Sequence, residues 1–105
     1  MSLTEQIQQI DRRIKAVLRG VAHDGLTRED AAVMKALKQH CNEVRLDVRQ
    51  YEYAETLADQ RKAGDAARKN LIKLEKDMLR LSDVFGPADT AELGAFIDKL
   101  RTDLL

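Results

Sequence analysis

Apolar side chains recur along most of the chain in alternating steps of three and four residues. The first set comprises Leu3, Ile7, Ile10, Ile14, Val17 and Val21, with polar or charged residues between them. Such steps place the apolar side chains on one narrow stripe of an α-helix, which is typical of a helix that packs against another helix. Ser2 and Glu5, at the start of this stripe, form a predicted capping box. The pattern predicts a helix over about residues 3–22.

A second stripe follows Thr27, a predicted N-cap residue, and comprises Val33, Met34, Leu37, Cys41, Val44, Val48 and Tyr51. Leu46, Tyr53 and Leu57 fall on nearly the opposite side of the same predicted helix. A helix with apolar side chains on both sides needs two packing partners. We therefore expect a helix over about residues 28–62 at the centre of the assembly. The stripe itself fails at Glu55, which occupies the next heptad position after Tyr51.

The sequence leaves two interpretations of the segment around Gly64. Gly64 could end the central helix, with Asp65 capping a new one. Alternatively the helix runs through, because one internal glycine costs only about 1 kcal/mol relative to alanine. A third apolar stripe does not continue the register of the second, which favours a turn. The sequence thus predicts a third helix over about residues 66–84, with this stripe: Ala67, Leu71, Leu74, Met78, Leu81 and Phe85.

Gly86 and Pro87 are typical of a helix end, and Asp89 is the predicted cap of a shorter fourth helix over about residues 89–104. This helix carries Leu93, Phe96, Ile97, Leu100 and Leu104. We expect an all-α fold in a single domain, residues 1–105. Its architecture would be an antiparallel helical bundle or a coiled-coil-like helical hairpin, with three longer helices and a short C-terminal one.

Charge and composition narrow the classes of partner. The formal net charge is zero, which gives no overall attraction to nucleic acid or to an anionic membrane. Residues 61–81 nevertheless carry seven basic and three acidic groups, whereas residues 23–60 carry five and eight. Alternating local charge favours helices that pair with one another or with a second copy. A single cysteine, the absence of a long apolar run and the lack of a signal-peptide pattern predict a cytoplasmic protein with no membrane association.

No arrangement of residues indicates catalysis, a cofactor, a metal or a small-molecule substrate. His40 and Glu43 have a spacing that metal ligands can adopt, but a site needs three or four converging donors and the only other histidine is His23. Cys41 lies on the apolar stripe, and its neighbour His40 points about 100° away on a helix, so the two cannot form a catalytic pair. The sequence predicts no catalytic, cofactor-binding or metal-binding residues.

Three candidate interaction surfaces remain. Leu46, Tyr53 and Leu57 form either a surface covered by another helix of the chain, which we favour, or a partner-docking patch. Ile7, Ile10, Ile14 and Val17 form a candidate self-association surface, because narrow stripes leave little core per monomer and invite a homodimer. Lys69, Lys73, Lys76 and Arg80 form a basic stripe that could contact phosphates, or an ordinary solvated face in which Lys73 pairs with Asp77.

From these features we expect a small, non-enzymatic helical module for protein–protein interaction or scaffolding, self-associating through its heptad-spaced apolar side chains. The alternative is an accessory nucleic-acid-binding protein that uses the basic stripe, although no aromatic residue accompanies that stripe for base stacking.

Overall fold

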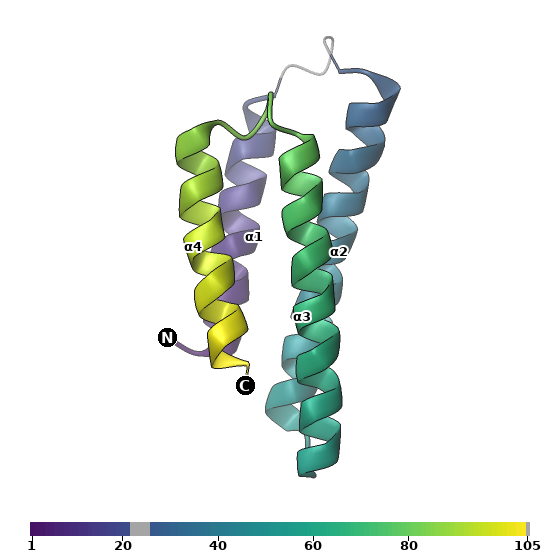
Figure 1. Cartoon of the computed structure of the whole chain (residues 1–105), viewed down its shortest axis with the longest axis vertical. Coiled ribbons are helices and arrows are strands. Elements are labelled where there is room, and N and C mark those ends of the chain that lie inside the picture. The colour runs from purple at the N-terminus through teal and green to yellow at the C-terminus, as the bar shows by residue number, and fades with distance from the viewer. Residues whose placement is uncertain (22–25, 105) are drawn as a thin grey trace.

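The described part of the chain, residues 1–21 and 26–104 of a computed structural model, contains four α-helices and no strands. They are α1 (Leu3–Arg19), α2 (Arg28–Tyr53), α3 (Leu57–Arg80) and α4 (Pro87–Asp103). Successive helices run in opposite directions, and both chain ends lie at the same end of α1 and α4 (Figure 1). The predicted all-α, antiparallel bundle is confirmed. His23 lies outside the described residues.

The helices are arranged so that sequence neighbours are also neighbours in space. Among the described residues, α1 contacts α2 and α4, and α3 contacts α2 and α4, with the most extensive contact between α2 and α3. The two central helices have 26 and 24 residues, whereas α1 and α4 have 17 each, so the helices form two longer and two shorter ones where the sequence predicted three longer and one short. At 1.5 Å per residue, α2 and α3 are therefore about 10 Å or more longer. Their joined ends project beyond α1 and α4 (Figure 1).

One hydrophobic core contains most positions of the three heptad-spaced stripes that the sequence indicated. Every named position of the third stripe, from Ala67 to Phe85, is buried, as are Val33 through Val48 of the second. Ile7, Ile10 and Ile14 are likewise buried in this core. Leu18 is buried at the end of α1, whereas Val17 is only partly covered. The apolar stripes are thus packed against one another within a single chain, which requires no second copy.

The turn between the central helices lies at residues 54–56, so the prediction of a turn at Gly64 is wrong. Thr56 is the N-cap of α3, and its hydroxyl accepts a hydrogen bond from the Asp59 backbone N–H at 3.1 Å. Thr27 caps α2 in the same way through Asp30. Both starts share the pattern Thr-x-x-Asp, so a signal for the turn was present in the sequence. The loss of the apolar stripe at Glu55 coincides with it.

Gly64 lies inside α3 because of packing. A Cβ atom there would lie 3.1 Å from the Leu104 backbone oxygen and 3.3 Å from Cε2 of Tyr51. Contacts at these distances are shorter than those usual in a well-packed interior, so the neighbouring atoms would have to move to accept the Cβ atom. The missing side chain therefore allows the end of α4 and the ring of Tyr51 to approach α3, and it does not mark a helix end. Asp65, the expected cap, is exposed and pairs with Arg68 one turn further on.

The remaining helix bounds differ at their ends. α1 ends at Arg19 and α3 at Arg80, both earlier than predicted, and α4 begins at Pro87. Gly86 is the N-cap of α4 and makes no side-chain capping hydrogen bond. Asp89 is therefore not a cap. It lies in the first turn of α4 and accepts a hydrogen bond from Arg13 of α1 at 2.6 Å, so its carboxylate joins the two helices.

The position of the turn can be tested by removing the caps. We expect Thr56→Ala to lower the free energy of unfolding by about 1 kcal/mol, because the first turn of α3 loses a side-chain acceptor. Asp65→Ala should change it by less than about 0.5 kcal/mol, since Asp65 is an exposed residue within a helix. Urea unfolding followed by circular dichroism measures both. A larger effect of Asp65→Ala than of Thr56→Ala would contradict a turn at residues 54–56.

The packing role of Gly64 can be separated from its helix propensity by comparison with Gly94. Gly94 lies within α4 and has open space around the position of a Cβ atom. Gly94→Ala should therefore stabilise the protein by about 0.5–1 kcal/mol, whereas Gly64→Ala should give less or the opposite sign. Gly64→Leu should destabilise it by about 1–3 kcal/mol through overpacking. Equal stabilisation by the two alanine substitutions in urea unfolding would show that the contacts of Gly64 do not matter.

Candidate functional site

Leu46, Tyr53 and Leu57 are exposed, with 51%, 75% and 62% of their surface accessible. The favoured interpretation, that another helix of the chain covers them, is therefore wrong. They also do not form one stripe, because α2 ends at Tyr53 and Leu57 is the first residue of α3. Leu46 and Tyr53 together line one hollow in the surface, and Leu57 lines another.

The first hollow lies between α1 and α2 and has a volume of about 270 Å³. Leu46 and Tyr53, seven residues apart on α2, line it together with these residues: Thr4, Ile7, Gln8, Asn42, Arg45 and Arg49. Beside it, the carboxylate of Glu52 accepts hydrogen bonds from the backbone N–H and the hydroxyl of Thr4, each at 3.1 Å. These bonds fix the start of α1 against α2. The hollow therefore combines a fixed backbone with exposed apolar and basic side chains, and we call it the α1–α2 hollow.

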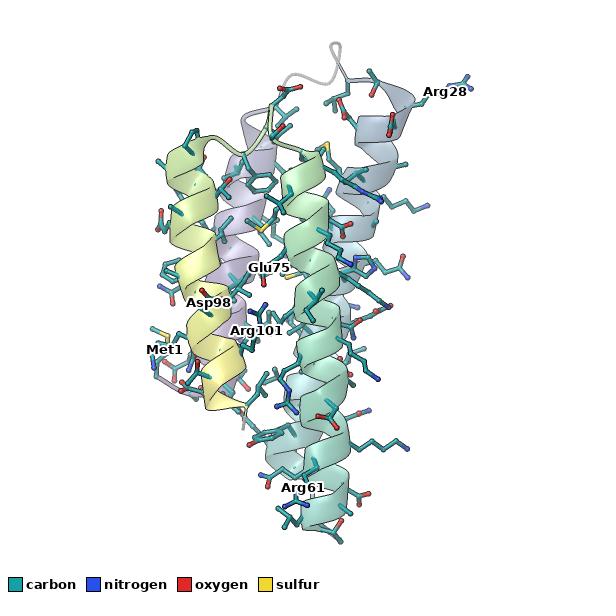
Figure 2. The ribbon with its side chains drawn as sticks, viewed as in Figure 1. Met1, Arg28, Arg61, Glu75, Asp98 and Arg101 are labelled. Atoms are coloured by element: carbon teal, nitrogen blue, oxygen red, sulfur yellow. The ribbon has the colours of Figure 1, made fainter. Side chains whose placement is uncertain are left out.

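Leu57 lines a second hollow of about 400 Å³, where the joined ends of α2 and α3 project beyond α4. Tyr51, Gln60, Arg61, Asp65, Arg68 and Leu104 complete its lining. Arg68 donates a hydrogen bond to the Leu104 backbone oxygen at 2.8 Å, so it ties the end of α4 to α3. Arg61 lies near the projecting end of α3 (Figure 2). This hollow is thus formed partly by Leu104 at the end of α4, which the sequence pattern gave no means of placing against α3.

The candidate self-association surface does not lie on the outside of the molecule. Ile7, Ile10 and Ile14 are buried in the core, and Val17 packs against it. A second copy could reach these side chains only if α1 left the bundle, which would expose the same apolar area again. The proposal of self-association through α1 is therefore corrected, because the other helices of the same chain already cover its stripe.

The basic stripe, Lys69, Lys73, Lys76 and Arg80, is exposed along α3. In the described part of the chain, none of these four cations forms an ion pair. The expected pair of Lys73 with Asp77 does not form. Asp77 is buried, and its Oδ2 lies 2.5 Å from Nδ1 of His40 on α2. The acid that the solvated-face interpretation paired with Lys73 is used instead to join α2 to α3.

Two apolar residues beside this stripe were not identified from the sequence as candidate surface residues. Ile72 and Leu79 lie on α3 outside its buried stripe, with 47% and 67% of their surface exposed. Glu75, which lies between them in sequence, pairs with Arg101 of α4, and Figure 2 shows these two side chains pointing toward one another. Ile72 and Leu79 are seven residues apart, and neither fits the buried stripe. This spacing was the signal in the sequence that could have identified them.

The residues considered for chemistry have other uses in the fold. Burial, with a smaller contribution from the charge of Asp11, raises the pKa of Cys41 to about 12, so its thiol stays protonated. His40 is held by Asp77, as described above. No group of three or more His, Cys, Asp or Glu side chains converges on a possible metal position within residues 1–21 and 26–104.

A second polar contact joins α2 to α3 along the same edge as His40 and Asp77. The side-chain amide of Asn70 donates a hydrogen bond to Oδ2 of Asp47 at 2.7 Å. Partial burial raises the pKa of Asp47, and the hydrogen bond from Asn70 acts in the opposite direction. These contacts describe a joint between helices, with each polar group satisfied by its partner across the interface.

Comparisons with known proteins leave function to be argued from the molecule itself. No family model, curated protein or solved structure matches the chain. Within the described residues, no helix combines the length and the apolar character needed to cross a bilayer.

The state of Cys41 gives a direct test of its burial. We expect the native protein at about pH 8 to react with a chromogenic disulfide reagent far more slowly than the unfolded chain, because only the thiolate attacks a disulfide. The reaction in about 6 M urea, where the whole chain is exposed, is the control. Rapid stoichiometric reaction of the folded protein would contradict both the burial and the raised pKa.

Proposed function

We propose that this chain is a small, non-enzymatic protein-interaction module that docks a partner through the α1–α2 hollow. The observation that supports the proposal most strongly is the exposure of Leu46 and Tyr53 on one line of α2. Side chains seven residues apart on a helix lie about 10 Å apart along its axis, which is the spacing at which a second helix offers apolar contacts.

The composition of the hollow supports a protein partner. Tyrosine and arginine are enriched among the residues that dominate binding energy at protein interfaces, and Tyr53, Arg45 and Arg49 all line this hollow. Its volume of about 270 Å³ lies below the usual range for sites that enclose a small molecule. The residues considered for catalysis, His40 and Cys41, are occupied elsewhere in the fold. A hollow lined by exposed apolar and basic side chains is suited to recognition.

The alternative function, nucleic-acid binding, has less support. The basic stripe is exposed, but no aromatic side chain stands among its cations and the whole chain has zero formal net charge. Non-specific nucleic-acid binding depends on the number of phosphates neutralised, and four cations on one helix would support only weak, strongly salt-dependent contact. Protein docking is therefore the function that we put forward.

The proposal is tested by placing charges in the hollow. We expect Leu46→Glu combined with Tyr53→Glu to lower the affinity for a partner captured from the native host by about tenfold or more, because two apolar contacts are replaced by charges. The matched control is Ala95→Glu with Thr102→Glu, which introduces the same charges with the same spacing on an exposed face of α4. Capture that both double variants reduce equally, or that neither reduces, would contradict docking at this hollow.

Light scattering on the purified protein distinguishes the two kinds of partner. A mass near twice 11.9 kDa that falls to a single chain in the Leu46→Glu, Tyr53→Glu variant would identify the partner as a second copy. A mass of one chain for the unmodified protein would identify it as a different protein. A dimer that the substitutions leave intact would place self-association elsewhere on the surface.

A further inference from the structure

We infer that the outer face of α3 is a second docking surface, and that its partner is an acidic amphipathic helix. The face consists of Ile72 and Leu79 together with the basic stripe Lys69, Lys73, Lys76 and Arg80, and we call it the α3 face. It lies on a different helix from the α1–α2 hollow, so the inference does not rest on the function proposed above.

The apolar part of the face has the geometry of a contact between helices. Ile72 and Leu79 are seven residues apart, so they lie within about 20° of one another around α3 and about 10 Å apart along it. This is the repeat of equivalent positions in a heptad. Both side chains are about half exposed or more, although the adjacent stripe from Ala67 to Leu81 is fully used in the core.

The charged part of the face determines which sign of charge a partner must carry. Lys69 and Lys76 are also seven residues apart, and each lies about 40–80° around the helix from the apolar line. They occupy the positions that flank a helix–helix contact and that set the choice of partner by charge. Side chains at such positions attract glutamate on a facing helix and repel lysine.

The acids within this part of α3 are already engaged by side chains of other helices. Glu75 pairs with Arg101 of α4, and Asp77 is held by His40 of α2. Arg101 also contacts Asp98 of α4 at 3.2 Å, so this one guanidinium engages an acid of α3 and an acid of α4 (Figure 2). The α3 face thus presents four cations and two apolar side chains, with no acidic side chain available between residues 69 and 80 to pair with the cations.

Two other anionic partners fit the face less well. The phosphate backbone of a nucleic acid would use the cations but would leave Ile72 and Leu79 against a hydrated, charged strand. An anionic bilayer would also use both, but a helix that binds a bilayer inserts a broad apolar face, whereas this face offers the narrow line of Ile72 and Leu79. A helix contacts a narrow line and can supply apolar and acidic side chains in the required register.

The test uses the full chain and a designed peptide as the probe. The peptide has about four heptads, with leucine at the a and d positions and glutamate at e and g. The control peptide carries lysine at e and g and is otherwise identical. We expect the labelled glutamate peptide to bind in fluorescence polarisation at about 50 mM NaCl and to bind more weakly at about 500 mM. The lysine peptide should not bind.

Variants locate the binding on the molecule. We expect Ile72→Gln with Leu79→Gln to weaken binding of the glutamate peptide about tenfold, and Lys69→Glu with Lys76→Glu to abolish it. All four residues are exposed, so these variants should unfold in urea at nearly the same concentration as the unmodified protein. The matched control, Leu46→Gln with Tyr53→Gln, changes two exposed apolar residues of the same spacing on α2 and should leave binding unchanged.

Several outcomes would overturn the inference. One is no binding of the glutamate peptide at low salt, and another is equal binding of both peptides. Binding that the α2 control variant removes and the α3 variants keep would assign the peptide to the α1–α2 hollow. Binding of phosphatidylserine vesicles or of a duplex of about 20 base pairs that needs Lys69 and Lys76, but is unchanged by the Ile72 and Leu79 substitutions, would assign the face to lipid or nucleic acid.

Discussion

The packing of α2 against α3 is the contact on which the rest of this bundle depends. These two helices are the longest, and they share the most extensive interface in the described structure. Their apolar stripes, from Val33 to Val48 and from Ala67 to Met78, are buried between them and against α1 and α4. The hydrophobic effect supplies the attraction but no direction. Polar contacts at the edge, His40 with Asp77 and Asp47 with Asn70, supply the register, because a sliding helix would leave buried polar groups without partners.

The same arrangement recurs around the bundle. Thr4 donates to Glu52 and Cys41 contacts Asp11 between α1 and α2, while Arg13 binds Asp89 between α1 and α4. Between α3 and α4, the pair of Glu75 with Arg101 and the hydrogen bond from Arg68 to Leu104 do the same. Each neighbouring pair of helices is thus joined by specific polar contacts beside a shared apolar core. Most of these contacts are partly exposed and add little stability, so their main effect is to specify which helices pair and in what direction.

The side chains that form the core and the polar contacts between helices are not available to a partner, so they determine which surfaces remain exposed. The α1 stripe, which resembled a surface for a second copy, is used in the core, and the acids near the basic stripe are used in helix joints. Besides Met1 and Leu57, the large apolar side chains exposed in the described structure form two lines, Leu46 with Tyr53 and Ile72 with Leu79, each accompanied by cations. The two lines lie on different helices, so the two proposed surfaces can be altered separately. The proposed interaction module would act through helix faces that its own core does not need.

The sequence by itself determined the helical class, the antiparallel arrangement and nearly all of the core, because heptad spacing can be satisfied only by helices that pack along one stripe. It also contained the true turn in Thr56 and Asp59, although the glycine at position 64 outweighed that signal in the prediction. Only the tertiary structure decided what each stripe and charge contacts. Gly64 is explained by Tyr51 and Leu104, and the buried Asp77 by His40, residues far away in the chain. A periodic pattern identifies which face of a helix is apolar, but which helix covers that face depends on the packing of all four.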